Sequence, residues 1–179
     1  MDLSFKIENF SVKLVTLLVI LLTIIIVTRK VFIDFHKVLG NSMVPNFQEG
    51  DLIMTQKLWS DLFGFQRGDV VILREPQNLG QTAIKRIIGL PMEKIKIQSG
   101  NVYINGDMLY EPYLFKKDQT LEGKFLSVNH EETIPDGQYF VMGDNRKESF
   151  DSREWGFVNK DLIIGQVWIR YWPLNFLNY

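Results

Sequence analysis

Residues 82–106 read TAIKRIIGLPMEKIKIQSGNVYING, and this stretch decides the fold class. It holds three short apolar runs rich in isoleucine and valine, a composition typical of β-strands. Ser99-Gly100 separates the second run from the third, and Asn105-Gly106 ends the third. Asn-Gly supplies the positive φ angles that tight hairpins need. The stretch therefore predicts strands over residues 82–89, 94–98 and 101–105.

Short apolar runs continue on both sides of this stretch, and Asp136-Gly137 gives one of them a further hairpin signal. Four more strands are expected, over residues 51–56, 69–74, 137–142 and 162–171. Between about residues 111 and 136 the pattern weakens into charged and polar residues with little periodicity. The sequence thus predicts a mainly β domain that contains a loop-rich lobe.

An uncharged run, LVTLLVILLTIIIVT, covers residues 14–28 between Lys13 and Arg29-Lys30. A helix of this length spans roughly 22 Å, and apolar neighbours with snorkelling basic side chains extend it toward a hydrocarbon core of about 30 Å. We expect a transmembrane anchor. A cleaved signal peptide would be followed by small residues, and a buried core helix would show a polar face. Basic residues flank the run on both sides, so charge does not set its orientation.

The amino-acid composition excludes several kinds of partner and active site. The chain has 179 residues, enough for one core-forming domain and an anchor. Its net charge of −1 argues against a nucleic-acid partner. It has no cysteine and only two histidines, His36 and His130, which argues against thiolate catalysis and the common zinc sites. No metal and no cofactor are expected, and a lysine base becomes more plausible than a histidine base.

Three segments carry candidate chemistry: residues 40–45 (GNSMVP), 83–91 (AIKRIIGLP) and 143–156 (GDNRKESFDSREWG). Each is weak alone, because a serine in a turn, a strand lysine and a polar loop are common. Together, and in this order, they closely resemble the type I signal peptidases, the membrane-bound Ser/Lys enzymes that remove signal peptides from exported proteins. The resemblance also covers the anchor and Gly68-Asp69-Val70, and so accounts for essentially the whole chain.

The resemblance implies an antiparallel, barrel-like β-sheet catalytic domain over residues 34–179, with a loop-rich insertion at about residues 91–138. A cytoplasmic tail over residues 1–13 and one transmembrane helix over residues 14–33 are implied before it. This single-anchor form is similar to that of Gram-positive enzymes. The implied location is the cytoplasmic membrane of a bacterium, with the catalytic domain on the outer face.

By this resemblance Ser42 is the nucleophile and Lys85 is the general base. A serine hydroxyl attacks poorly until a neighbouring base removes its proton. Lysine does this only when neutral, and its reference pKa is about 10.4, so the site has to lower that pKa. Burial lowers the pKa of a lysine, and Ile84, Ile87 and Ile88 are apolar neighbours that fit this demand.

The resemblance also implies supporting residues. Ser149 matches the serine that hydrogen-bonds the lysine, and Asp151 with Arg153 matches a supporting ion pair; an ordinary surface salt bridge is the alternative for that pair. The backbone N–H of Ser42 is the first expected oxyanion donor. Some family members place a serine where this chain has Gly40, so the second donor at this position stays open.

Family members cut after small residues at positions −1 and −3, and an extended substrate between strand edges at residues 38–40 and 83–85 explains that spacing. Shallow pockets are expected there, with core packing as the alternative. Six residues are expected to line them: Val38, Leu39, Met43, Phe47, Ala83 and Ile84. Exported preproteins and membrane lipid are the expected partners, and no oligomeric state is predicted.

Two other functions stay open. A self-processing Ser/Lys peptidase shares the dyad, and a non-catalytic membrane-bound binding protein could share the fold. The anchor argues against the first, and the presence of Ser42, Lys85, Ser149 and Asp151 argues against the second. Six aromatic residues form either a membrane-contacting surface or core: Trp59, Phe63, Phe65, Trp168, Trp172 and Phe176.

Overall fold

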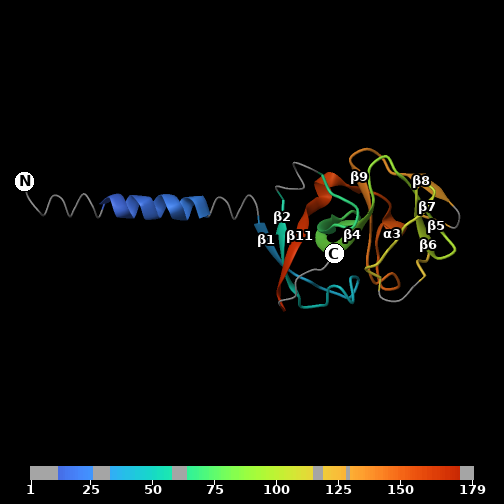
Figure 1. Ribbon diagram of the computed structural model, residues 1–179, viewed down its shortest axis with the longest axis horizontal. Coiled ribbons are helices and arrows are strands. Elements are labelled where there is room, and N and C mark those ends of the chain that lie inside the picture. The colour runs from blue at the N-terminus through green and yellow to red at the C-terminus, as the bar shows by residue number, and fades with distance from the viewer. Residues whose placement is uncertain (1–11, 26–32, 58–63, 115–118, 128–129, 174–179) are drawn as a thin grey trace, which may run out of the picture.

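The computed structural model describes residues 12–25, 33–57, 64–114, 119–127 and 130–173. A helix covers residues 12–25, and the rest of the described chain is mainly antiparallel β-structure, as expected (Figure 1). None of the described helices combines the length and the apolarity needed to cross a bilayer. The elements after residue 32 are β1 (Ile33–Lys37), β2 (Leu52–Gln56), β3 (Val70–Glu75), β4 (Asn78–Gly89), β5 (Lys94–Gln98), β6 (Asn101–Ile104), β7 (Asp107–Met108), β8 (Glu131–Thr133), β9 (Gln138–Met142), α3 (Ser152–Trp155), β10 (Val158–Asn159), η1 (Lys160–Leu162) and β11 (Ile163–Trp172).

The larger sheet has seven strands in the order β1-β2-β11-β3-β4-β9-β10, and every neighbouring pair is antiparallel. The C-terminal strand β11 lies between β2 and β3, so it joins the two halves of this sheet. Residue partners slip at several places along β11, which marks bulges that bend the strand. The sheet is therefore bent along β11.

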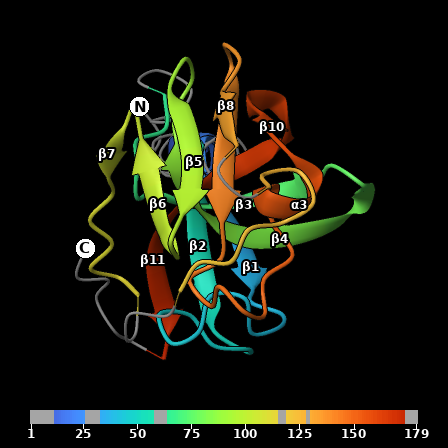
Figure 2. The same cartoon turned by 90° about the vertical axis from the view of Figure 1, so that its right-hand side faces the viewer.

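The smaller sheet has four strands in the order β7-β6-β5-β8, and it stands in front of β1, β2 and β11 in Figure 2. Its β5–β6 turn uses Ser99 at φ 51° and Gly100 at φ 76°. Its β6–β7 turn uses Asn105 at φ 53° and Gly106 at φ 93°, the positive angles of a two-residue hairpin. All four strands fall within residues 91–138, the segment that the sequence predicted as a loop-rich insertion.

The strands expected from the sequence are present, with small shifts at their ends. Strand β5 has the predicted bounds, whereas β4 begins at Asn78 instead of residue 82. Residues 78–82 are exposed, so no burial pattern marked them, and of these Asn78 and Thr82 pair with residues of β3. Strands β1, β7, β8 and β10 were not predicted, because they are short or have few apolar residues.

The buried side chains form three clusters, and β4 contributes to all of them. Ile84 packs with residues of β2, β3 and the segment after β1; Ile87 packs with β3 and β9; Ile88 packs with the smaller sheet. Lys85 and Arg86 lie between these isoleucines, and both are buried. Strand β4 therefore carries two consecutive basic side chains through the centre of the domain.

Candidate active site

Ser42 lies in a turn that follows β1, and a loop after β9 fixes the turn in place. The backbone N–H of Asn145 donates to Ser42 O at 2.9 Å, and its side-chain Nδ2 donates to Asn41 O at 3.1 Å. Ser42 Oγ lies 3.5 Å from Ile84 O, directly before Lys85 in β4. The fold thus brings residues 40–45, β4 and the loop after β9 to one place.

Gly143 is where the loop and the turn come closest together. A Cβ atom at this position would lie 2.3 Å from Ser149 Oγ and 2.4 Å from Ser42 O, closer than real Cβ contacts occur. Only glycine fits between these two residues. Gly40, in contrast, has open space around it but a φ of +77°, which explains why a glycine rather than a serine stands two residues before Ser42.

The Lys85 side chain is buried, with a residue exposure of 4%. Desolvation lowers its pKa from 10.5, and the nearby negative charges of Asp151 and Glu75 oppose that shift only in part. Among the described residues, Lys85 makes no ion pair. The environment therefore favours the neutral amine, which is the form that accepts a proton.

Asp151 is fully buried, and its carboxylate is occupied by other donors. Arg153 donates to both carboxylate oxygens, from Nε at 2.8 Å and Nη2 at 2.9 Å, and the Gly143 N–H donates to Oδ2 at 3.0 Å. The pair is buried, which rules out the surface salt bridge left open above. Ser149 Oγ is also buried, and within the described chain it has no hydrogen-bond partner. The expected bond from Ser149 to Lys85 is therefore not formed in this structure.

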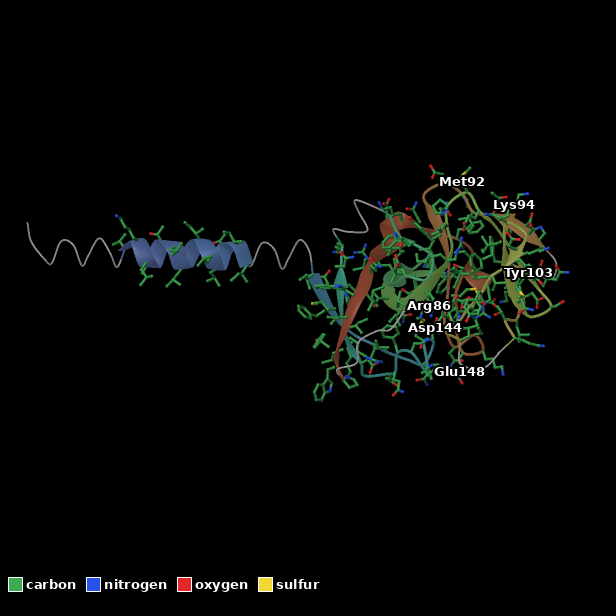
Figure 3. All side chains as sticks on the ribbon, viewed as in Figure 1. Arg86, Met92, Lys94, Tyr103, Asp144 and Glu148 are labelled. Atoms are coloured by element: carbon green, nitrogen blue, oxygen red, sulfur yellow. The ribbon has the colours of Figure 1, made fainter. Side chains whose placement is uncertain are left out.

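A second buried ion pair lies on the opposite face of β4, and sequence reasoning missed it. Arg86 donates to Asp144 from Nε at 2.8 Å and Nη2 at 2.6 Å, and the two residues lie side by side in Figure 3. Asn46 Nδ2 donates to the same carboxylate at 2.7 Å, and the Tyr113 ring lies 4.2 Å from the guanidinium. Asn46 ties the turn that contains Ser42 to this pair. No sequence pattern links these residues, which come from distant segments.

A groove of about 260 Å³ runs between the end of β1 and β4. Of the expected pocket residues, Val38, Leu39, Ala83 and Ile84 line it. Met43 and Phe47 do not; they are fully buried in the cluster beneath, so the core-packing alternative holds for these two. Five further residues line the groove without having been predicted: Phe35, His36, Lys37, Ile72 and Thr82.

The expected aromatic surface is only partly present. Trp168 and Trp172 are 57% and 63% exposed on β11. Phe65 is buried and packs edge-to-face against Tyr139, so it is core. The other three residues of the set lie outside the described ranges: Trp59, Phe63 and Phe176.

Comparison with known proteins gives consistent matches. The family model described as "Signal peptidase, peptidase S26" matches residues 11–172. Signal peptidase I U of Bacillus subtilis is 36% identical over 90% of this chain and 88% of its own length. Signal peptidase I of Bacillus caldolyticus is 35% identical over 84% and 86%. A probable signal peptidase I-2 of Synechocystis is 36% identical, and this chain spans 61% of its length.

Among solved structures, a signal peptidase I from Enterococcus faecalis is 35% identical to this chain. The match covers 57% of this chain and 95% of the other, with a TM-score of 0.48.

Proposed function

We infer the reaction from one premise: this chain belongs to the signal peptidase family, peptidase S26, and is an enzyme of that family. Its activity is the removal of signal peptides by a serine peptidase. We propose that Ser42 is the nucleophile and Lys85 the general base. The observation that carries this assignment is a buried lysine, next to the turn that contains Ser42, that makes no ion pair with any residue the structure describes.

The proposed reaction proceeds in two steps. Neutral Lys85 takes the proton of Ser42 Oγ as this oxygen attacks the scissile carbonyl carbon. The tetrahedral intermediate collapses, the new N-terminal amine leaves with the proton held by Lys85, and an ester to Ser42 remains. Lys85 then takes a proton from water, the hydroxide attacks the ester, and Ser42 is released with its proton restored.

The supporting residues act on the base and on the oxyanion. Because Arg153 and Gly143 occupy Asp151, this carboxylate positions the loop of Ser149 without holding Lys85 in its charged form. The unpartnered Ser149 Oγ is available to bind the Lys85 amine when substrate is bound. The Ser42 N–H and a donor near Gly40 stabilise the oxyanion.

The groove supports a substrate that lies extended between the β1 end and β4. An extended peptide presents alternate side chains to the same side, so positions −1 and −3 would face the groove floor. Val38 and Ile84 form part of that floor, and both are buried apolar residues. We propose that this shallow floor selects small residues at both positions in exported preproteins.

We also propose that the segment from residue 14 to the start of β1 anchors the chain in the cytoplasmic membrane of a bacterium, with the catalytic domain on the outer face. Ile33, expected at the end of the anchor, is instead the first residue of β1. The uncharged run and the exposed Trp168 and Trp172 support contact with lipid, because tryptophan favours the membrane interface. The anchor also keeps Ser42 near the bilayer, where signal peptides emerge.

Cleavage of a radiolabelled preprotein by the detergent-solubilised full chain tests the assignment. Wild type is expected to cut after a small residue, and mass spectrometry of the product locates the cut. Ser42→Ala is expected to lose cleavage by about 10⁴-fold or more, because the nucleophile is gone. Asn41→Ala, a change in the same turn, is the matched control. Cleavage by Ser42→Ala at the wild-type rate would rule out the dyad.

A further inference from the structure

The edge of β4 that faces the groove is open only up to Lys85. Strand β9 pairs with β4 from Arg86 onward, where Arg86 is opposite Met142. On that edge, within the described chain, no strand pairs with β4 before Arg86. A peptide strand bound in the groove would therefore lie in line with β9 and meet the loop that follows β9.

This geometry dictates the path of the peptide beyond the scissile bond. The residues before the cut occupy the groove beside residues 82–84, and the bond to be cut lies at Ser42 and Lys85. The residues after the cut cannot continue along β4, because β9 already covers that edge. They have to leave the sheet over the surface of the loop at residues 143–151.

Phe150 is the large apolar side chain that this loop exposes. It is 51% exposed and packs edge-to-face against Trp155, with ring centroids 5.2 Å apart. Figure 3 shows Glu148, two residues earlier, at the outer surface of the domain. Phe150 directly follows Ser149, and a Cβ atom at Gly143 would lie 2.3 Å from Ser149 Oγ and 2.4 Å from Ser42 O, so this loop packs against the Ser42 turn. An exposed aromatic ring on such a loop is a natural contact for a passing peptide.

The backbone on both sides of Phe150 is held firmly. Ser149 O accepts from Arg153 Nη2 at 3.2 Å, and the Asp151 carboxylate accepts from Gly143 and Arg153. The ring is therefore positioned before substrate arrives, and binding costs little ordering entropy. A rigid exposed aromatic ring of this kind discriminates between side chains that pack on it and those that do not.

We propose that Phe150 contacts the first or second residue after the scissile bond and gives this enzyme a preference for an apolar side chain there. The inference rests on the proposed function, and it assigns the mature N-terminus of the substrate to a site of its own. It concerns only the residues after the cut, so it is independent of the selection of small residues before the cut.

The test uses the full chain in detergent and synthetic peptides that span a cleavage site. The peptides differ only at the first or second position after the cut, where they carry Leu, Phe, Ala or Asp. Wild type is expected to cleave the Leu or Phe peptides about 3- to 10-fold more efficiently than the Ala peptide, by kcat/KM. Phe150→Ala is expected to abolish this ratio, Phe150→Leu to keep most of it, and Phe150→Lys to favour Asp.

Two controls isolate the effect. Tyr110→Ala removes an aromatic ring that is 83% exposed next to the smaller sheet, and it should leave every ratio unchanged. A separate pair of peptides carries Ala or Leu at position −1 and is otherwise identical, and Phe150→Ala should keep the wild-type preference for Ala in this pair. An unchanged ratio in Phe150→Ala, or an equal loss with all peptides, would overturn the inference alone. Failure of wild type to cut any of these peptides or a preprotein would overturn the proposed function instead.

Discussion

Lys85 and Arg86 are consecutive residues of β4, are buried to the same extent, and face opposite sides of the sheet, yet they meet different surroundings. Arg86 has a carboxylate of its own, Asp144, which accepts two hydrogen bonds from it. Lys85 faces Asp151, but Arg153 already occupies that carboxylate. A buried cation with a dedicated partner stays charged and contributes to structure. A buried basic group next to a carboxylate that is already paired with another cation shifts toward its neutral form and is available for chemistry.

The largest expected effect comes from placing arginine at position 85, so that positions 85 and 86 carry the same residue. Lys85→Arg keeps a long cationic side chain but cannot supply a neutral base, because a guanidinium stays protonated at any accessible pH. We expect kcat/KM on a signal-peptide substrate to fall by about 10⁴-fold. Steady-state kinetics on detergent-solubilised protein measure this, with circular dichroism to verify folding. Retention of more than a tenth of the activity would contradict the role of Lys85.

The next effect is on stability. Arg86→Met leaves the Asp144 carboxylate buried without its cation, and it should lower the free energy of unfolding by about 3–5 kcal/mol. Urea unfolding measures the loss. The double variant Arg86→Met/Asp144→Leu removes both charges and should recover part of it. If the double variant is less stable than the single one, the ion pair is not the cause.

A smaller effect is expected in the pH dependence of activity and of stability, which depends on the pKa of Lys85. Burial lowers the pKa of Lys85 from 10.5, and only its deprotonated form is active, so kcat/KM should rise about tenfold per pH unit below that pKa and level off above it. The unfolded chain holds this proton to higher pH than the folded one, so stability should also rise with pH between the lowered pKa and 10.5. Lys85→Met should lose that rise in stability. A rate that still climbs above pH 10.5 would contradict a lowered pKa.

The smallest effect concerns the ring next to Arg86. Tyr113→Leu removes the aromatic face that lies 4.2 Å from the guanidinium and should cost about 0.5–2 kcal/mol of unfolding free energy more than Tyr113→Phe, which keeps the ring. Tyr103→Leu is the matched control, because its ring faces the exposed Lys96 at 5.2 Å. Equal losses in Tyr113→Leu and Tyr113→Phe would show that the hydroxyl, not the ring, matters.

The sequence predicted those strands that have alternating apolar residues and that end at glycine-containing turns. The β5–β6 hairpin follows directly from alternating apolar residues and Ser99-Gly100. Strand β1 was missed because it follows a long apolar run, is short and has only two apolar residues, Ile33 and Phe35. The position of β11 between β2 and β3 was also out of reach, since strand order depends on contacts between distant segments.

In the candidate site, too, the sequence predicted the residues of local motifs but not the contacts between distant segments. The resemblance named Ser42, Lys85 and Asp151 because each lies in a recognisable motif. Met43 and Phe47 were expected to line the substrate pockets, with core packing as the alternative, and they are core residues. A motif gives the position of a residue in the chain but not its exposure. The partners Asn46 and Tyr113 had no signal at all, because their roles arise only when three segments meet.

Strand β4 takes part in all three buried clusters, and this has a consequence for hydrogen exchange. Amides in such a strand exchange with solvent only when the whole domain unfolds, whereas amides in a surface turn exchange through local openings. The proposed base therefore lies in the part of the molecule that opens most rarely. The proposed nucleophile lies in a turn that is held by hydrogen bonds of Asn145 and Asn46 and by the buried side chains of Met43 and Phe47. Local openings of this turn should then separate the proposed nucleophile from the proposed base far more often than global unfolding does.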